Sequence, residues 1–445
     1  MLESWRTKVA KQQPHYQAED KLTEITQTLR TRPGLVYATE IERLTGELAA
    51  AGRGESFVLM GGDCAETFAT TTEEQIRLKI QTILQMGVVL SYGASLPVVK
   101  IGRIAGQYAK PRSLDVEKRA DESLPVYRGD AVNGIAYTAE ERQADPSRLL
   151  EMYQHCLATL NLIRAYTKGG FADINLLHKW NEGFKTNPAY SRYESLAEDI
   201  RRALKFMVAS GAEIEGLRDQ DFYASHEALL LEYEAAMIRP APHNDGLYNT
   251  SGHFLWIGER TRDIEGAHVE LLSKVKNPIG VKLGPTATAS EVLALSEKLN
   301  PQNLPGKFTA ITRMGAEQIR NVLPPILAAV QAEGKEVVWL SDPMHGNTIQ
   351  TDSGIKTRHF DTIFNEVEGF FASHQAVGTV AGGLHIELTG DDVTEVLGGA
   401  ENLTEVDLEQ RYESLVDPRL NHQQSLEMAF RVAELLQNGT NENLS

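Results

Sequence analysis

Cysteine and long apolar runs are the two features that this sequence has least of. Its 445 residues contain only two cysteines, Cys64 and Cys156. Two cysteines cannot build the disulfide framework of a small secreted protein, so a reducing compartment is expected. No stretch approaches the roughly 18 apolar residues of a membrane-spanning helix, and residues 1–6 lack the apolar segment of a secretory signal. The sequence therefore predicts a cytoplasmic protein with no membrane partner.

Positive charge is also scarce. The chain has 44 Lys and Arg against 61 Asp and Glu, and its formal net charge is −17. Such a field repels nucleic acid, so no nucleic-acid partner is expected. The chain has neither a G-x-G-x-x-G fingerprint nor a P-loop, which argues against dinucleotides and nucleoside triphosphates. In so acidic a chain, a local group of Arg and Lys side chains indicates that an anion binds there.

The sequence does have a regular alternation of short β-rich runs and helical patterns. The runs lie at residues 56–60, 97–102, 221–224, 254–257, 279–282, 308–312, 336–340 and 384–388. Strands that alternate with helices predict a parallel sheet, and eight such units predict an α/β fold closed into a (β/α)₈ TIM barrel. Gly382 and Gly383 precede a strand rather than a helix, so they are interpreted as a strand entry and not as a phosphate loop.

Two helical additions accompany the predicted barrel. Residues 1–50 are expected to form an N-terminal helical extension, with two helical stretches separated by an Arg-Pro-Gly turn at 32–34. Residues 51–445 are expected to form the catalytic barrel. Between its second and third strands, a helical insertion is predicted at about 147–211, packed outside the barrel.

Positively charged side chains recur at the carboxyl ends of the predicted strands, where a parallel barrel has its active site. They are Arg103, Arg260, Lys282 and Arg313. We expect them to surround a compact anion such as a phosphoryl carboxylate. Arg binds phosphate and carboxylate through paired hydrogen bonds, and Lys acts as a point charge. The alternative interpretation is four unrelated, solvated surface charges.

A second basic loop follows the second strand. It contains Lys110, Arg112 and Ser113, with Pro111 stiffening the chain between them. Its Arg and Ser side chains are candidates to hold another phosphate. An exposed basic loop without a ligand fits the composition equally well.

Four further residues are candidates for metal ligands: Cys64, His345, Glu387 and Asp417. A thiolate, an imidazole and two carboxylates suit a borderline divalent ion such as Mn²⁺, Co²⁺ or Zn²⁺. The residues lack the close spacing of a zinc-finger motif, and a lone cysteine is usually a small buried hydrophobe. Composition therefore favours a buried thiol for Cys64, and more so for Cys156, which lies in a helical pattern.

Long ordered motifs run along nearly the whole chain: GGDCAE at 61–66, KIGRIAGQYAKPRS at 100–113, SHEALLLEYE at 225–234, SGHFLWIGERTR at 251–262, NPIGVKLGP at 277–285, ITRMGA at 311–316, WLSDPMHGNT at 339–348, GGLHIELTGDDVTE at 382–395 and DPRLN at 417–421. These motifs resemble those of class II 3-deoxy-D-arabino-heptulosonate 7-phosphate (DAHP) synthases. Motifs of this length and order are highly specific.

The resemblance implies a role for each candidate residue. The metal ligands would be Cys64, His345, Glu387 and Asp417. The phosphoenolpyruvate site would consist of Arg103, Glu259, Arg260, Lys282 and Arg313. The erythrose 4-phosphate loop would contain Lys110, Arg112 and Ser113. Lys110, Glu259 and Lys282 are the residues expected to take part in catalysis.

The resemblance also implies the reaction and the partners. Phosphoenolpyruvate, erythrose 4-phosphate and water would give DAHP and phosphate, with a divalent metal, Mn²⁺ before Co²⁺ or Zn²⁺, polarising the aldehyde. A homodimer or homotetramer is expected, and an aromatic amino acid effector and a chorismate mutase partner are further candidates.

The sequence departs from the family pattern at three places, and three alternative functions are considered. Met60 stands where Gln is expected, Ala316 where Asn is expected, and residues 214–218 are unfamiliar. None of these removes a candidate ligand or substrate cation. The rivals are a condensing enzyme for another phosphorylated aldose, a metal-dependent aldolase that releases no phosphate, and a catalytically silent barrel that senses aromatic amino acids or docks a partner.

Overall fold

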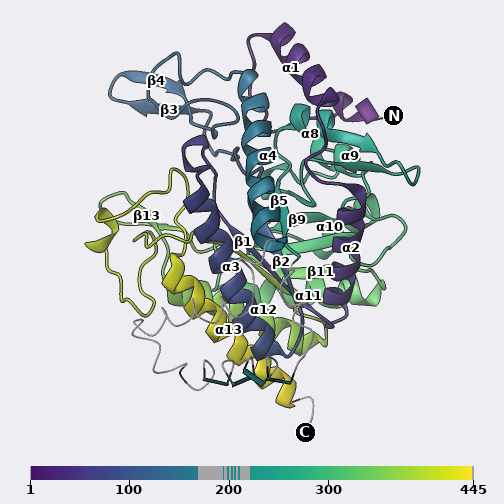
Figure 1. Ribbon diagram of the computed structural model, residues 1–445, viewed down its shortest axis with the longest axis vertical. Helices are drawn as coiled ribbons and strands as arrows, with labels where there is room; N and C mark the ends of the chain where they lie inside the picture. Colours follow the sequence, from purple (N-terminus) through teal and green to yellow (C-terminus); the bar gives the residue numbers. More distant parts are fainter. Residues whose placement is uncertain are drawn as a thin grey trace.

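The computed structural model describes residues 2–168, scattered residues between 194 and 210, and residues 221–442 (Figure 1). The predicted insertion at 147–211 lies partly outside these residues. Its first part is helix α4 (Ser147–Lys168). The helical pattern expected at 195–209 falls mostly on residues that the structure does not describe, as do residues 214–218.

A closed barrel of parallel strands forms the centre of the molecule, in the order β1-β14-β11-β10-β9-β8-β5-β2. The strands are β1 (Phe57–Gly62), β2 (Val98–Arg103), β5 (Tyr223–Glu227), β8 (Phe254–Ile257), β9 (Ile279–Leu283), β10 (Phe308–Thr312), β11 (Val338–Ser341) and β14 (Gly383–Glu387). Each predicted strand overlaps one of these. The predicted TIM barrel is confirmed, and Gly383 does begin a strand.

The register of the barrel brings polar side chains together at one rim. Gly62, the last residue of β1, pairs with Glu387 of β14 on one side and with Arg103 of β2 on the other. Arg103 in turn pairs with Ser225 of β5. Because parallel strands end at the same rim, side chains far apart in the sequence become neighbours there.

Helices cover the outside of the barrel. They are α3 (Glu73–Ala94), α8 (Leu231–Met237), α9 (Ala267–Leu272), α10 (Ala289–Leu299), α11 (Ile319–Ala332), α12 (Phe360–Val377) and α13 (His422–Glu442). The short 3₁₀ turns η2 (Phe68–Thr70), η4 (Glu259–Thr261) and η5 (Asp407–Glu409) lie in the loops that follow β1, β8 and β14. α10 begins with a capping box, in which Thr288 accepts from the Glu291 amide and the Glu291 side chain accepts from the Thr288 amide. α3 and α13 approach closely, because a Cβ on Gly93 would lie 2.3 Å from that of Ala433.

The N-terminal extension comprises η1 (Leu2–Thr7), α1 (Glu19–Thr31) and α2 (Ala38–Gly52), and its last helix closes the opposite end of the barrel. η1 packs against α9, and α1 packs against α8 and α4. Leu44, Leu48 and Ala51 of α2 form one buried cluster with barrel residues that include Ile101 and Phe254. α2 is therefore an apolar plug, whereas the boundary between extension and barrel at residue 50 stays a prediction.

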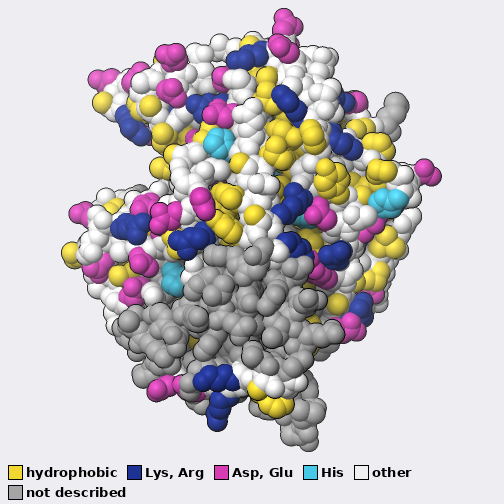
Figure 2. Space-filling view, viewed as in Figure 1, with side chains coloured by type: hydrophobic (Ala, Val, Ile, Leu, Met, Phe, Trp, Pro, Cys, Tyr) yellow, Lys and Arg dark blue, Asp and Glu magenta, His cyan; other side chains and the backbone are white. Residues whose placement is uncertain are grey.

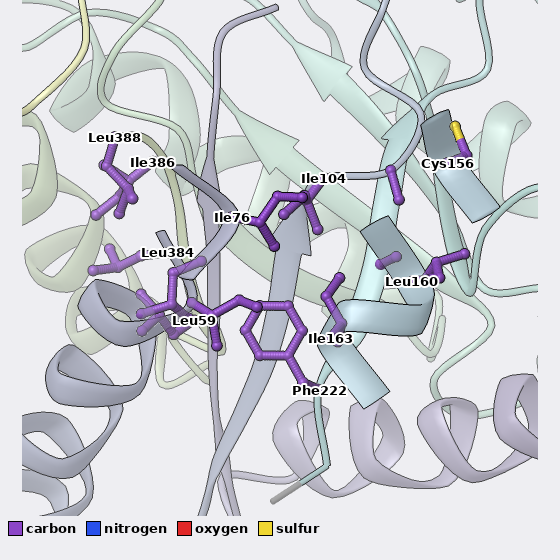
Figure 3. Close-up of a cluster of buried hydrophobic side chains, with 14 of the residues drawn as sticks. Leu59, Ile76, Ile104, Cys156, Leu160, Ile163, Phe222, Leu384, Ile386 and Leu388 are labelled. Carbon is purple, nitrogen blue, oxygen red and sulfur yellow. The ribbon is translucent and has the colours of Figure 1, made fainter. Parts of the chain in front are cut away.

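Another apolar layer lies between the barrel and its helices (Figure 3). Leu59 of β1 and Leu384 of β14 contribute to it from the strands, and Leu160 of α4 contributes from outside. Cys156 belongs to the same layer and is a free, buried thiol, as its helical context predicted. None of the described helices combines the length and the apolar character that crossing a membrane requires.

Three antiparallel hairpins project from the barrel: β3 (Val116–Arg119) with β4 (Glu122–Pro125), β6 (Ile238–Pro240) with β7 (Leu247–Asn249), and β12 (Ile349–Gln350) with β13 (Lys356–Thr357). The β3–β4 hairpin follows β2 and the β12–β13 hairpin follows β11, so both leave the rim where the strands end. Figure 1 shows these two hairpins on the same side of the molecule. In the space-filling view of Figure 2, the molecular surface is hollowed between them.

Candidate active site

A cavity of about 250 Å³ lies at this rim. Its lining residues are Arg103, Lys110, Pro111, Glu227, Trp256, Gly258, Glu259, Arg260, Lys282, Arg313, His345 and Asp417. All four cations predicted at strand ends are among them. They converge on one space, which favours the anion-site interpretation over four unrelated surface charges.

Arg103 is the deepest of these cations, with 1% of its surface exposed. Its Nε donates to the Asp63 carbonyl at 3.0 Å, and its Nη2 donates to Glu387 Oε1 at 3.1 Å. Its guanidinium lies 5.0 Å from the ring centre of Trp256. Glycine at position 62 makes this packing possible, because Gly62 has a φ of 144° and a Cβ there would lie 2.6 Å from the Arg103 carbonyl oxygen.

Lys282 faces the same ring and is paired with a buried carboxylate. Its Nζ lies 5.8 Å from the ring centre of Trp256 and forms an ion pair with Asp342. Burial lowers the pKa of Lys282 to about 8, with the Asp342 carboxylate opposing the shift. Burial alone would raise the pKa of Asp342, yet the neighbouring His345 and Lys282 hold it well below its ordinary range.

Arg313, Arg260 and Glu259 are held by contacts between rim loops. Arg313 Nη2 donates to the His345 carbonyl at 3.0 Å, and Arg260 Nη2 donates to Ser113 Oγ at 2.8 Å. Both carboxylate oxygens of Glu259 accept hydrogen bonds, one from the Gly284 amide at 2.7 Å and one from Arg262 at 3.1 Å. These contacts fix the orientation of the Glu259 carboxylate.

The predicted phosphate loop divides into two parts. Lys110 is buried, and its Nζ lies 3.3 Å from Glu387 Oε1 and 3.5 Å from Asp417 Oδ2. Arg112 and Ser113 lie further out, where Arg112 is half-buried and Ser113 is exposed. Lys110 therefore belongs to the carboxylate cluster rather than to the outer part of the loop.

Three of the four predicted metal ligands form a compact group. One ligand atom from each of Cys64, Glu387 and Asp417 lies within 4.8 Å of the others. His345 adjoins them, with Nε2 3.0 Å from Glu387 Oε1. Its Nδ1 is hydrogen-bonded to Asp342 Oδ2 at 2.7 Å, so a carboxylate orients the imidazole as in many metal sites.

This donor set fits a divalent metal. Glu387 Oε2 is buried without a hydrogen bond, although Arg358 Nη1 forms an ion pair with it at 2.9 Å. Burial raises the pKa of the Cys64 thiol well above its ordinary value, with the Glu387 carboxylate adding to the shift. A thiol, an imidazole and two carboxylates around one point match the preferences of borderline ions.

Nearly the whole chain matches a known protein family. The model of the class-II DAHP synthetase family matches residues 1–433. The chain belongs to this family. A phospho-2-dehydro-3-deoxyheptonate aldolase from Streptomyces coelicolor (strain ATCC BAA-471 / A3(2) / M145) is 51% identical over 433 residues, which is 97% of this chain and 96% of that protein. The aldolase AroG of Mycolicibacterium smegmatis (strain ATCC 700084 / mc(2)155) is 52% identical over 442 residues, or 98% and 94% of the two chains.

A solved structure of phospho-2-dehydro-3-deoxyheptonate aldolase from Francisella tularensis SCHU S4 covers 94% of this chain and 97% of its own, at 14% identity and a TM-score of 0.47. That similarity is too distant to bear on the site. The family membership does confirm the resemblance carried by the sequence motifs. Of the departures from the family pattern, Met60 is buried in the barrel interior, and the Ala316 amide donates to Asn347 at 3.1 Å.

Several residues at the site of this DAHP synthetase family member had no role in the sequence analysis. Asp342, Trp256 and Glu227 all lie on or directly after predicted strands, so their positions were a usable signal. Burial raises the pKa of Glu227, whose Oε1 is enclosed without a hydrogen bond partner. Arg358 follows the small strand β13, and nothing in the local sequence pointed to its contact with Glu387.

Two buried carboxylates support the rim loops from behind. Glu66 accepts hydrogen bonds from the amides of residues 105–107, at the start of the loop that carries Lys110. Glu366 accepts from the amides of Met314 and Gly315 and from the Asn347 side chain. Burial raises the pKa of Glu366 to about 7.

Proposed function

We propose that this member of the DAHP synthetase family condenses phosphoenolpyruvate with D-erythrose 4-phosphate and water. The products are 3-deoxy-D-arabino-heptulosonate 7-phosphate and phosphate, in the first step of the shikimate pathway. The observation that carries the proposal is the convergence of four strand-end cations and a Cys-His-Glu-Asp set at one small cavity. The family and its relatives support the same reaction.

Phosphoenolpyruvate is the anion that the four cations would hold. Arg103 and Lys282 are buried beside Trp256, and Arg260 and Arg313 line the same cavity nearer the rim loops. Cations preorganised in a site of low dielectric bind phosphate and carboxylate more strongly than they do in water. They would also keep the enol carbon C3 in register for attack, so positioning and electrostatics supply much of the acceleration.

Cys64, His345, Glu387 and Asp417 would hold a divalent metal, with Mn²⁺ as the first choice and Co²⁺ or Zn²⁺ as alternatives. When bound, such an ion polarises the aldehyde oxygen as a Lewis acid. Lys110 lies within 3.5 Å of Asp417, beside this group. The aldose carbonyl is therefore expected between the Lys110 ammonium and the phosphoenolpyruvate site.

Two residues transfer protons in this proposal, and a third orients the attacking water. C3 of phosphoenolpyruvate bonds to the aldehyde carbon, and Lys110 gives a proton to the alkoxide that results. Water then adds at C2, and loss of phosphate gives the keto acid. Glu259, held by the Gly284 amide and Arg262, orients that water, while Glu227 has an oxygen free to accept its proton.

The phosphate of the aldose is assigned to Arg112 and Ser113, at the outer part of the basic loop. Among the described residues, none accepts a hydrogen bond from the Arg112 guanidinium, so it is available to an anion. Homo-oligomer formation, an aromatic amino acid effector and a chorismate mutase partner stay predictions that follow from the family resemblance.

A phosphate-release assay with both substrates tests the proposal. We expect release that requires both substrates, falls sharply in EDTA and returns with Mn²⁺ or Co²⁺. Other phosphorylated aldoses, tested in place of erythrose 4-phosphate, should support slower release. Condensation without phosphate release would instead indicate an aldolase, and undiminished activity of a metal-free preparation would refute the metal assignment.

A further inference from the structure

The N-terminal segment between η1 and α1 lies along the rim loops of the barrel. The Val9 carbonyl accepts from the Ala267 amide at 3.1 Å, and Lys8 forms an ion pair with Glu265 at 2.6 Å. Gln13 continues the contact, with Nε2 donating to the Leu229 carbonyl at 2.8 Å. The segment is thus anchored to the loops that follow β8 and β5.

Between these anchors, Gln12 pairs with the main chain of the basic loop. Gln12 Nε2 donates to the Arg112 carbonyl at 3.1 Å, and the Arg112 amide donates to Gln12 Oε1 at 2.8 Å. One side-chain amide thereby satisfies both main-chain groups of one residue, in the manner of a strand pair. Arg128 Nη1 donates to the same Oε1 at 3.2 Å, and the Arg128 carbonyl accepts from the Lys110 amide at 2.9 Å.

The backbone of Gln12 is itself in an unusual conformation, with a φ of 62°. Residues other than Gly and Asn rarely adopt the left-handed region, and they stay there only where surrounding contacts enforce it. At Gln12 those contacts include the pairing with Arg112, about 100 residues away in the sequence. The strained turn aims the amide at the loop.

We infer that Gln12 is a positioning residue for the phosphate of the aldose substrate, because it fixes the main chain from which Arg112 and Ser113 reach that phosphate. The inference rests on the proposed function for the role of Arg112. Gln12 touches no reacting atom. Its effect should therefore appear in the affinity for the aldose phosphate and not in the affinity for phosphoenolpyruvate.

The first test is Gln12→Met, which keeps the length of the side chain and removes its donor and acceptor. We expect the KM for erythrose 4-phosphate to rise about tenfold, roughly the effect of losing a hydrogen bond or two, with kcat and the KM for phosphoenolpyruvate within about twofold. The matched control is Lys8→Met, which frees the same segment from Glu265 without touching the loop. Its kinetic constants should equal those of the wild type.

A double-mutant cycle separates positioning from a general structural role. In a background that carries both Arg112→Ala and Ser113→Ala, the loop has lost the two side chains that Gln12 positions, so Gln12→Met should raise the KM for the aldose no further. Two effects that simply multiply would overturn the inference. If Gln12→Met fails to fold, Gln12→Gly replaces it, because glycine relieves the positive φ while still removing the amide.

Limited trypsin cleavage tests the contact between Gln12 and the basic loop without relying on enzyme activity. Cleavage after Arg112 should be faster in Gln12→Met than in the wild type or Lys8→Met, and the bond after Lys110 is protected by Pro111. An equal rate of this cleavage in all three proteins would overturn the inference even if the condensation reaction is established. If the wild type releases no phosphate, the proposed function fails, and the cleavage experiment alone decides whether Gln12 holds the loop.

Discussion

At the scale of single residues, burial gives the candidate site an unusual set of ionisation states. Lys282 is a buried ammonium whose pKa lies near 8, although Asp342 is its partner. Desolvation destabilises the charged ammonium form by more than the attraction of the Asp342 carboxylate stabilises it. A Lys in this position remains a cation at neutral pH but loses its charge within the range in which proteins can be assayed.

This property predicts a pH dependence of phosphoenolpyruvate binding. The anion binds the ammonium form, so above about pH 8 its affinity for the wild type should fall, approaching about tenfold per pH unit. Lys282→Arg keeps its charge throughout this range and should bind phosphoenolpyruvate with little change between about pH 7 and about pH 9. Calorimetric titration of both proteins measures the difference. Parallel pH profiles would contradict the prediction.

At the scale of elements, helix α12 holds two rim loops through one side chain. Glu366 accepts from the Met314 and Gly315 amides after β10 and from Asn347 after β11. The first loop follows Arg313, a cation of the proposed phosphoenolpyruvate site. The second contains His345, a candidate metal ligand. A helix outside the barrel thus sets the relative position of two groups inside the cavity.

Glu366→Ala should therefore weaken the binding of both phosphoenolpyruvate and the metal ion. Without the carboxylate, two buried amides and the Asn347 side chain lose their acceptor, and we expect a loss of stability of about 2–4 kcal/mol. Affinities for phosphoenolpyruvate and for Mn²⁺ should fall together. Calorimetry and thermal unfolding measure these effects, and Glu368→Ala on the same helix is the control. Loss of stability without any change in either affinity would show that Glu366 does not position the loops.

At the scale of the whole molecule, the two ends of the barrel have different tasks. One end carries the cavity and the candidate metal ligands, and the other is filled by α2. Leu48 of α2 has 0% of its surface exposed and packs with residues of the barrel interior. The plug therefore contributes burial of apolar surface at the end of the barrel opposite the cavity.

Leu48→Ala should lower stability while leaving the chemistry intact. A cavity left by truncating a buried Leu costs about 2–5 kcal/mol, so the unfolding midpoint in urea should fall. The kcat for phosphate release should stay within about twofold, since the site lies at the other rim. Thr39→Ala, at an exposed position of the same helix, is the control and should change neither quantity. A large fall in kcat at unchanged stability would contradict this separation of roles.

The sequence by itself determined the barrel and most of the candidate site. Strands buried on both faces are short continuous apolar runs, and their carboxyl ends carry the polar groups, so both signals are local. Arg103, Lys282 and Arg313 were identifiable for that reason. The motifs around them carry the family resemblance without reference to any tertiary contact.

Only the tertiary structure decided which of these groups touch. Lys110 lies with the carboxylates around Glu387 and not with Arg112 at the outer part of the loop. Arg358, which follows the β12–β13 hairpin, forms an ion pair with Glu387. Gln12, in the N-terminal segment, holds the main chain of the basic loop. Barrel register and the packing of rim loops bring these partners together across tens to hundreds of residues. No periodicity of the local sequence encodes such contacts, because they depend on how the eight strands close into a barrel and on how the rim loops then pack.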